Sequence, residues 1–420
     1  MMTDVLIIGA GLAGLSAALA CRDAGLDFRV LEAGAAPGGR AQTRRVGGAK
    51  GGWPADMGGH WLHGEDSPLR ALIERYRLPA RPDEGAFFIS ENGHLHASDD
   101  DWLTRVIDGD LARRIRLGEA PDVPLPDLAK DGEGRVRLED FGYLWNGLEP
   151  PLRPSAREYL TDENTPGGLQ LGGGVGALIE ALAGDIGYAR IRCNTAVTHV
   201  VAISDSVCAR ASDGTSWLAR RAIFTGSLAV LTSGMVRFDP PLSDATRAHL
   251  DGMVMGEMNK IVIAVDHAFL RERGVAPDTA YELLDARPPH FCHVHSGGAP
   301  LIQLYACGER ARRIERLNAD QAVGYVSALL RHIPALAGFE AHMHGPPLIS
   351  TWSANLFTQG AYSALLPGRR RSGPCKEGPV VLCGEAFDER FPASLAGAWR
   401  SGQAAVRSLS GLYTQQMAAV

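Results

Sequence analysis

Three glycines near the amino terminus have the spacing of a phosphate-binding turn. Gly9, Gly11 and Gly14 follow the apolar run of residues 5–8 directly, and Glu32 ends the next apolar run, 18 residues after Gly14. Gly9 suits a tight turn, Gly11 lets backbone N–H groups approach a pyrophosphate, and Gly14 lets a helix pack closely on a strand. The carboxylate of Glu32 can accept hydrogen bonds from a ribose diol. This context predicts a dinucleotide site.

A second glycine turn follows at Gly38 and Gly39, and Arg40 comes directly after it. A plain nicotinamide site has no evident need for a second close backbone approach and a cation. A longer ligand can use both. The pair of turns therefore favours FAD over a nicotinamide cofactor.

Further side chains that could take part in chemistry come later in the chain. His60 and His63 lie in a segment dense in small residues, and an imidazole can orient a substrate or exchange a proton with it. A histidine-containing turn without chemistry is the alternative. Lys260 opens the apolar run of residues 261–265. Taken alone, it is typical of a solvated lysine at a strand end.

No metal site is expected. His290, Cys292, His293 and His295 resemble a ligand cluster at first sight. We predict that they lie on a strand, where alternate residues point to opposite faces, and no outer ligand can be identified. The seven cysteines are scattered and have no zinc-ligand spacing.

Apolar periodicity indicates the elements that must position these residues. The expected strands are 5–8, 28–32, 197–203, 207–211, 222–225, 261–265 and 380–383. The expected helices are 15–24, 177–184, 319–332 and one that begins near Ser394. Residues 77–165 are expected to form an inserted, partly helical region, with loops at 238–242 and at the arginine run 369–371.

The strand–turn–helix–strand order at the amino terminus predicts the α/β class. We expect a discontinuous Rossmann-like FAD-binding domain and an α+β substrate domain whose mixed sheet is flanked by helices. The first domain is assigned residues 1–76, 166–239 and 374–420. The second is assigned residues 77–165 and 240–373.

Composition narrows the function class further. The chain has 420 residues, 45% hydrophobic and 21% charged, which is typical of a folded soluble protein. The net charge is −6, and acidic and basic residues are interspersed along the sequence, so no basic segment indicates binding to nucleic acid or to an anionic membrane. An odd number of scattered cysteines fits reduced thiols, so we expect a cytoplasmic protein without a membrane span. The sequence leaves the oligomeric state open, and a homodimer is one alternative.

The ordered set of motifs resembles the flavin-containing amine oxidases, the family of monoamine, polyamine and L-amino acid oxidases. The similarity covers nearly the whole chain. It rests on the two glycine turns with Glu32 and Thr43, on Asp56-x-Gly58 leading to Trp61-Leu62-His63-Gly64, on Asn259-Lys260, on Gly360-Ala361-Tyr362-Ser363, on Gly384-Glu385 and on residues 397–405. The first elements also occur in carotenoid desaturases and protoporphyrinogen oxidase, whereas the last four narrow the choice.

The resemblance implies three catalytic residues. Lys260 is expected to contact flavin N5 through a water, His63 to orient the substrate amine, and Tyr362 to line the substrate channel. Ala361 stands where covalently flavinylated monoamine oxidases carry a cysteine, which implies noncovalent FAD. Ser394 replaces the second tyrosine of the monoamine oxidase cage, so no two-tyrosine cage is expected.

The resemblance also implies which residues hold the cofactor. These are Gly9, Gly11, Leu12, Ala13, Gly14, Glu32, Ala33, Gly38, Gly39, Arg40, Gly58, Gly59, His60, Trp61, Val197, Trp352, Gly384, Glu385, Ser394 and Leu395.

The expected reaction is the FAD-dependent oxidation of an amine. Hydride would pass from the carbon next to nitrogen to flavin N5, the imine would hydrolyse, and dioxygen would be reduced to hydrogen peroxide. A polyamine, a monoamine and an amino-acid-like amine all remain open as substrates. The alternative function is a flavin-dependent desaturase or dehydrogenase that acts on a carbon–carbon bond and uses another electron acceptor.

Overall fold

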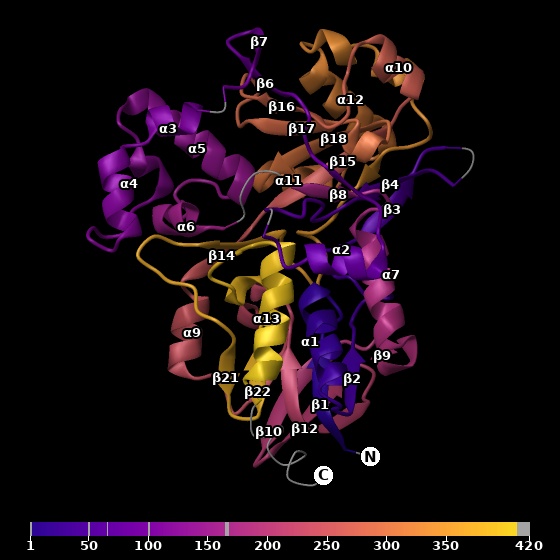
Figure 1. The fold of residues 1–420 in the computed structure, drawn as a ribbon, viewed down its shortest axis with the longest axis vertical. Coiled ribbons are helices and arrows are strands. Elements are labelled where there is room, and N and C mark those ends of the chain that lie inside the picture. Colours follow the sequence, from indigo (N-terminus) through magenta and orange to yellow (C-terminus); the bar gives the residue numbers. More distant parts are fainter. Residues whose placement is uncertain (1, 49–50, 65, 100, 164–167, 410–420) are drawn as a thin grey trace.

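A computed structural model describes residues 2–48, 51–64, 66–99, 101–163 and 168–409. Within these residues a nine-stranded sheet fills the lower half of the molecule in Figure 1. Its strands are β1 (Thr3–Ile8), β2 (Phe28–Leu31), β9 (Ile191–Arg192), β10 (Val197–Ile203), β11 (Ser206–Ala211), β12 (Ser216–Phe224), β13 (Arg237–Asp239), β21 (Cys375–Glu377) and β22 (Val380–Leu382).

The centre of this first sheet is parallel, in the order β9-β2-β1-β12-β22. β1 is apolar on both faces because both faces are covered. On one face, α1 (Leu12–Asp23), α7 (Val175–Ile186) and α13 (Leu395–Arg407) pack on Val5, Ile7 and Val30, and α1 and α13 lie side by side in Figure 1. The other face packs Leu6 and Ile8 against Phe224. The carboxyl ends of β1 and β2 therefore open toward the middle of the molecule.

A seven-stranded sheet fills the upper part of the molecule (Figure 1). Its strands, in spatial order, are β19 (Leu348–Ile349), β15 (Met258–Ala264), β18 (Leu301–Cys307), β17 (His290–Val294), β16 (Thr279–Leu283), β6 (Phe87–Glu91) and β7 (His94–Ala97). The sheet is antiparallel apart from the parallel pair of β16 and β6.

The two faces of this second sheet differ. One face packs under α10 (His267–Glu272) and α12 (Ala319–Leu330) and carries Ile261, Cys292 and Leu304 in an apolar core. The opposite face carries Lys260 and Tyr305, which pair across β15 and β18, together with His293 on β17. Alternation along these strands thus separates a structural face from a face that can serve a site.

The remaining elements join the two sheets. Two-stranded ribbons form from β3 (Thr43–Val46) and β4 (Trp53–Asp56), from β5 (Ala80–Pro82) and β8 (Leu169–Leu171), and from β14 (Met253–Gly256) and β20 (Tyr362–Leu365). Further helices are α2 (Arg70–Tyr76), α8 (Leu228–Thr232), α9 (Asp244–Leu250) and α11 (Gly308–Ile314). Short 3₁₀ turns are η1 (Leu125–Leu128), η2 (Tyr188–Arg190), η3 (Ser296–Gly298), η4 (Pro334–Leu336), η5 (Phe339–His342) and η6 (Glu385–Phe387).

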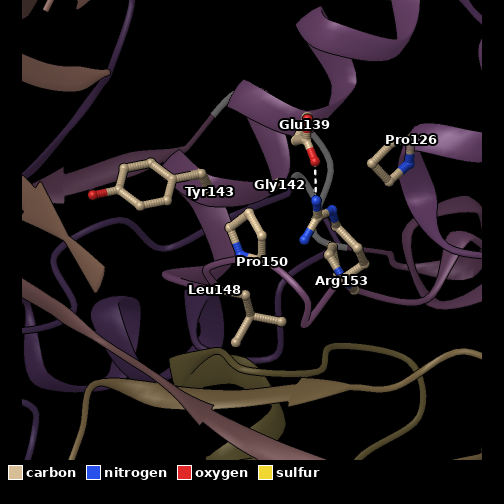
Figure 2. Close-up of a pocket in the computed structure, with 8 residues that line it drawn as sticks. Pro126, Glu139, Gly142, Tyr143, Leu148, Pro150 and Arg153 are labelled. Carbon is tan, nitrogen blue, oxygen red and sulfur yellow. Dashed lines mark hydrogen bonds and ion pairs between the residues drawn. The ribbon is translucent and has the colours of Figure 1, made fainter. Parts of the chain in front are cut away.

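A helical insertion lies beside the junction of the two sheets (Figure 1). It contains α3 (Trp102–Val106), α4 (Gly109–Arg116), α5 (Gly132–Asn146) and α6 (Ala156–Thr161), which share a small apolar core. Asp131 caps the start of α5, and Gly147 ends it in the left-handed conformation. A cavity of about 20 Å³ lies beside α5, next to the Arg153–Glu139 ion pair. Figure 2 shows side chains that line it. This space holds little more than one water molecule, so it is not a ligand site.

This architecture confirms the predicted α/β class with a mixed second sheet and an inserted helical region. The first helix begins at Leu12, three residues earlier than expected, because Gly11 already serves as its N-cap. The expected loop at 238–242 is wrong in part, since Phe238 and Asp239 pair with β10 in β13. The domain boundaries stay a prediction, and the one between 165 and 166, like residues 410–420, lies outside the described residues.

The expectation of a solvated arginine run is wrong for Arg371. Its side chain is 2% exposed and forms a buried ion pair with Glu158 on α6, while Arg369 and Arg370 are exposed. Arg371 also donates to the hydroxyl (2.7 Å) and the carbonyl oxygen (3.0 Å) of Ser363. Arg371 is therefore buried in the protein interior, although it belongs to a polar loop, because Glu158, 213 residues away in the sequence, pairs with it.

Arg371→Met is therefore expected to lower the free energy of unfolding by about 3 kcal/mol, because it leaves the Glu158 carboxylate buried without its partner. Chemical denaturation measures the effect. The same change at the exposed neighbour, Arg370→Met, serves as the control and should stay within about 0.5 kcal/mol. Equal stabilities of the two variants would contradict this assignment.

Among the described residues, no helix combines the length and the apolar character needed to cross a membrane. All seven cysteines are free thiols.

Candidate active site

One large cavity of about 880 Å³ lies between the two sheets and the helical insertion. Its size is near the upper end of the range for small-molecule and cofactor sites. Of the predicted cofactor residues, all but Gly14 line it. They are Gly9, Gly11, Leu12, Ala13, Glu32, Ala33, Gly38, Gly39, Arg40, Gly58, Gly59, His60, Trp61, Val197, Trp352, Gly384, Glu385, Ser394 and Leu395.

The first glycine turn forms one end of this cavity. Gly9 has φ +105°, a backbone conformation that side chains disfavour. A Cβ atom on Gly14 would overlap the carbonyl oxygen of Gly9, so Gly14 serves helix packing and does not face the cavity. A Cβ atom on Gly11 would meet nothing closer than the Gly38 carbonyl oxygen at 4.0 Å. The turn therefore leaves open space beside Gly11.

Glu32 lies at the end of β2, beside this turn. Its two carboxylate oxygens accept hydrogen bonds from the backbone N–H groups of Ala10 (2.6 Å) and Gly34 (2.7 Å). Burial raises the pKa of Glu32, which these two hydrogen bonds oppose. Each oxygen keeps a second acceptor site, so Glu32 can still accept from a diol in the cavity.

The second glycine turn is fixed against the first. Gly38 donates its N–H to the carbonyl oxygen of Ala10 (2.9 Å). Arg40 donates to Glu385 (2.8 Å) and to the carbonyl oxygen of Ala361 (2.9 Å). Burial alone would raise the pKa of Glu385, but Arg40 and Arg371 hold it below its usual range. The cavity wall thus contains a fixed charge cluster built from three distant segments.

Lys260 stands in the cavity wall and is only 3% exposed. Its ammonium Nζ donates to the carbonyl oxygens of Asp56 (2.8 Å) and Gly58 (2.7 Å), and it lies 3.2 Å from His60 Nδ1. The ring of Tyr305 lies beneath it, with Nζ 4.8 Å from the ring centre. These contacts hold a buried cation in the wall of the site, on the inner face of the second sheet.

The Asp56-x-Gly58 motif acquires a physical role from these contacts. The Asp56 carboxylate is occupied elsewhere, since it accepts from Thr43 and from the N–H of Val175 (2.9 Å) at the start of α7. Its backbone carbonyl is what binds Lys260. Burial lowers the pKa of Lys260 to about 7, and the nearby Asp56 carboxylate opposes that shift. Lys260 can therefore exchange a proton near neutral pH.

His60 is buried between Lys260 and the aromatic wall. Tyr305 Oη lies 3.0 Å from His60 Nδ1, the same atom that Lys260 approaches. Because both neighbours are donors, Nδ1 is the acceptor and the neutral ring carries its proton on Nε2. Burial first, and then the charge of Lys260, hold the pKa of His60 well below its usual range.

Asn259 explains why Lys260 and Trp352 lie together. Its buried amide oxygen accepts from Ser350 Oγ (2.8 Å) and from the N–H of Trp352 (2.9 Å). The indole of Trp352 in turn donates to the carbonyl oxygen of Met57 (2.9 Å). Asn259, the polar residue before the lysine, therefore fixes the part of the cavity wall that packs against Gly58.

Aromatic side chains form the other end of the cavity. Trp61 stacks on Tyr305 with ring centres 6.1 Å apart, and Trp145 from α5 lies 6.3 Å from Trp61. Tyr362 lines the same space and donates its hydroxyl to the carbonyl oxygen of Trp145 (2.5 Å). Since that hydroxyl is engaged, Tyr362 offers its ring to the cavity. Phe141 completes this wall.

The predicted residue His63 also lines this end of the cavity. Burial lowers its pKa to about 4, so the imidazole is neutral at physiological pH. A neutral imidazole can donate or accept a hydrogen bond without adding charge. The structure thus brings all three predicted catalytic residues, Lys260, His63 and Tyr362, to one cavity.

Sequence reasoning missed several of the residues that complete the wall. Phe141, Trp145 and Tyr159 come from the inserted region, and their aromatic character was the only available signal. Tyr305 lies opposite Lys260 in the strand register, which can be known only once β15 and β18 are paired.

The predicted strand is confirmed for His290, Cys292 and His293, which lie in β17. It is wrong for His295, which follows the strand in the left-handed conformation with φ +59°. His293 also has acidic neighbours. Ligand-type atoms of Asp83, Asp278 and His293 lie within 4.8 Å of one another. Asp278 already binds the Arg81 guanidinium and accepts from Gln170 (2.9 Å) and the N–H of Gly297 (2.7 Å). A cation placed there would face Arg81, so these residues are poorly suited to a metal ion.

Comparison with known proteins gives a consistent picture. The sequence model of a family described as flavin containing amine oxidoreductase matches residues 12–163 and 155–410. Polyamine oxidase 2 of Arabidopsis thaliana is 26% identical over 449 residues, covering 95% of this chain and 86% of that protein.

Two solved structures share the fold at low sequence identity. Wild-type putrescine oxidase bound to putrescine superposes with a TM-score of 0.80 at 21% identity, over 98% of this chain and 99% of the other. Cyclohexylamine oxidase from Brevibacterium oxydans IH-35A gives a TM-score of 0.80 at 18% identity, over the same shares of the two chains.

Proposed function

The chain belongs to the family of flavin-containing amine oxidoreductases, and on that premise we propose that it oxidises a small amine at the carbon next to nitrogen. It is an FAD-dependent amine oxidase. The position of Lys260 is the observation that supports oxidation next to the nitrogen. Lys260 is a buried cation in the cavity wall, between the glycine-lined end and the aromatic end. The aromatic side chains at the other end of the cavity support the proposed class of substrate.

The glycine-lined end of the cavity fits FAD. Open space beside Gly11 leaves room for a pyrophosphate, and Glu32 retains acceptor sites for a ribose. Arg40 contributes positive charge to the wall of the same cavity. We assign cofactor binding to the predicted cofactor residues that line the cavity, all but Gly14. Attachment would be noncovalent because position 361 is alanine.

FAD held by these wall residues would supply an electron acceptor at N5 for the hydride from the carbon next to the amine nitrogen, and dioxygen would then take up the electrons as hydrogen peroxide. The chain's own residues prepare the amine for this reaction. Only the neutral amine can release hydride, although a free amine has a pKa of about 10 in water. A buried site next to Lys260 disfavours a second cation and so favours the neutral amine. The imine product then hydrolyses to a carbonyl compound and an amine.

The aromatic end orients and shields the substrate. Trp61 and Tyr362 line the space beyond Lys260, and the neutral His63 can hydrogen-bond the amine nitrogen. These side chains exclude water around the carbon that loses hydride. The arrangement suits a small, largely apolar amine.

Peroxide production in air tests this proposal. The purified flavoprotein is mixed with monoamines, diamines, polyamines and amino acids, and hydrogen peroxide is measured for each compound. At least one amine is expected to yield peroxide in equal amounts with its carbonyl product. Substrate turnover at a carbon–carbon bond, with electrons passed to a carrier and no peroxide from any amine, would instead support the desaturase alternative.

His63→Leu is expected to lower kcat/KM for that amine about tenfold, which corresponds to the loss of one neutral hydrogen bond. Because the pKa of His63 is about 4, the ring is neutral from pH 6 to pH 10 and the shape of the pH profile should not change. Steady-state kinetics across this range measures both effects. His96→Leu, at an exposed histidine, is the control. A displaced pH profile would contradict a neutral role for His63.

A further inference from the structure

A chain of buried polar side chains leads from Lys260 away from the cavity. It passes through His60 and His293 to Asp278, whose partner Arg81 is 36% exposed and so reaches the surface. His60 is 3% and His293 1% exposed. Neither imidazole serves the packing of an apolar core in an evident way. The question is what two neutral histidines do between a buried lysine and a surface ion pair.

Unpartnered atoms mark the middle of this chain. Among the described residues, His60 Nε2, both ring nitrogens of His293 and the amide oxygen of Gln303 are buried without a hydrogen-bond partner. Buried polar atoms are seldom left so, and an ordered water bonded to several of them removes the cost. The rings of His60 and His293 are stacked with centres 5.4 Å apart. Because ring nitrogens hydrogen-bond in the plane of the ring, a water that bridges His60 Nε2 and a nitrogen of His293 would lie at the edge of this stack.

We propose that His60 and His293 form a proton relay that carries the proton lost by the substrate ammonium from Lys260 to Asp278 and the surface. This inference rests on the proposed function. Lys260 carries its charge until it passes its own proton to His60 Nδ1. The neutral Nζ then takes the proton of the substrate ammonium, which leaves the free amine in the site and Lys260 charged again. His60 in turn releases the proton on its Nε2 through the bridging water to His293. No electrons are transferred in these steps.

The contacts at each end suit this direction. Lys260 has a third donor position toward His60 Nδ1 at 3.2 Å, and Tyr305 Oη can hold the same nitrogen at 3.0 Å when Lys260 is neutral. At the far end, His293 Nε2 lies 3.8 Å from Asp278 Oδ1. Burial lowers the pKa of His293 to about 4, so a proton moves through the ring without remaining there.

The charged and titratable groups around the relay come from several elements. Lys260, His63 and Tyr305 face His60, and Asp83, Asp278 and Arg81 face His293. The positive charge of Lys260 next to His60 drives the proton outward, whereas the carboxylates of Asp83 and Asp278 attract it at the outer end. The gradient of charge therefore runs from the cavity to the surface.

Binding of tert-butylamine tests the relay independently of turnover, because the carbon bonded to its nitrogen carries no hydrogen and cannot be oxidised. The oxidised holoenzyme is mixed with this amine in a stopped-flow instrument. Binding is followed by the flavin absorbance, and proton release by an indicator dye. At pH 7 the wild type is expected to release one proton as the free amine binds.

His293→Leu should slow this release and the associated binding step at least tenfold at pH 7. At pH 10, close to the ordinary pKa of an amine, a large fraction of the amine arrives already neutral and has no proton to lose. The two proteins should then bind it at rates within about twofold. His293→Gln retains a polar side chain that cannot carry a proton, and it should show the same defect even where the leucine variant folds poorly. His290→Leu removes a buried imidazole on the opposite face of β17 and should behave as the wild type.

Equally fast proton release in the two His293 variants would overturn the relay, as would a defect of the same size at pH 10. Absence of any flavin absorbance change in the wild type has a different meaning. It would show that the site does not bind amines, which would contradict the proposed function itself.

Discussion

Gly11→Val is expected to yield a folded protein that has lost most of its affinity for FAD. Gly11 has φ −68° and ψ 179°, a conformation open to valine, and a Cβ atom there meets only the Gly38 carbonyl oxygen at 4.0 Å. The added side chain therefore strains no protein contact and projects into the cavity where a pyrophosphate would lie. We expect the dissociation constant for FAD to rise at least ~100-fold, or about 2.7 kcal/mol.

Titration of the apoprotein with FAD measures this effect, with a thermal melt of the apoprotein as the check on folding. Gly14→Ala is the matched contrast, since its Cβ atom would overlap the Gly9 carbonyl oxygen and should destabilise the fold itself. Wild-type FAD affinity in Gly11→Val would mean that the cofactor does not use this turn.

Lys260→Met is expected to retain FAD and to slow the reaction of the reduced enzyme with dioxygen about 100-fold. Negative charge develops on dioxygen as it takes up electrons, and a fixed cation in a water-poor site stabilises that charge. Methionine has a similar length but no charge. Stopped-flow mixing of the reduced enzyme with oxygenated buffer measures the rate, and the flavin content of the variant shows whether the cofactor is retained.

The same cation predicts the pH dependence of this step. Lys260 has a pKa of about 7, so its charge is present below that pH and is lost above it. The rate of oxidation by dioxygen should therefore fall as the pH rises from 6 to 8 in the wild type and stay flat in Lys260→Met. Loss of all flavin in the variant would instead identify Lys260 as a structural residue. An unchanged rate would contradict its role next to the reacting atoms.

The parts of the site that could be predicted are those encoded by local sequence. The turn at Gly9, Gly11 and Gly14 follows from sterics within a few residues, and Glu32 follows from the length of one strand–helix–strand unit. The position of Lys260 could be expected from the motif that surrounds it. Its actual partners, the carbonyl oxygens of Asp56 and Gly58, lie about 200 residues earlier in the chain.

What escaped prediction depends on contacts between distant segments. Trp145 and Phe141 line the cavity only because α5 packs beside the second sheet, and nothing in their own segment indicates that neighbour. Arg371 belongs to a sequence typical of a solvated loop, yet its side chain is buried in an ion pair with Glu158. His293 was placed on the correct kind of element, but its neighbours Asp83 and Asp278 come from other parts of the chain. Pairing between strands and helices decides such positions.

The central claim is that an amine reaches FAD next to Lys260. Anaerobic mixing of the purified yellow protein with the amine panel, followed by flavin absorbance, tests this most directly. We predict that at least one amine bleaches the flavin at a rate that depends on its concentration, and that Lys260→Met still binds the cofactor. A fully loaded flavoprotein whose absorbance no amine, polyamine or amino acid can bleach would contradict the account.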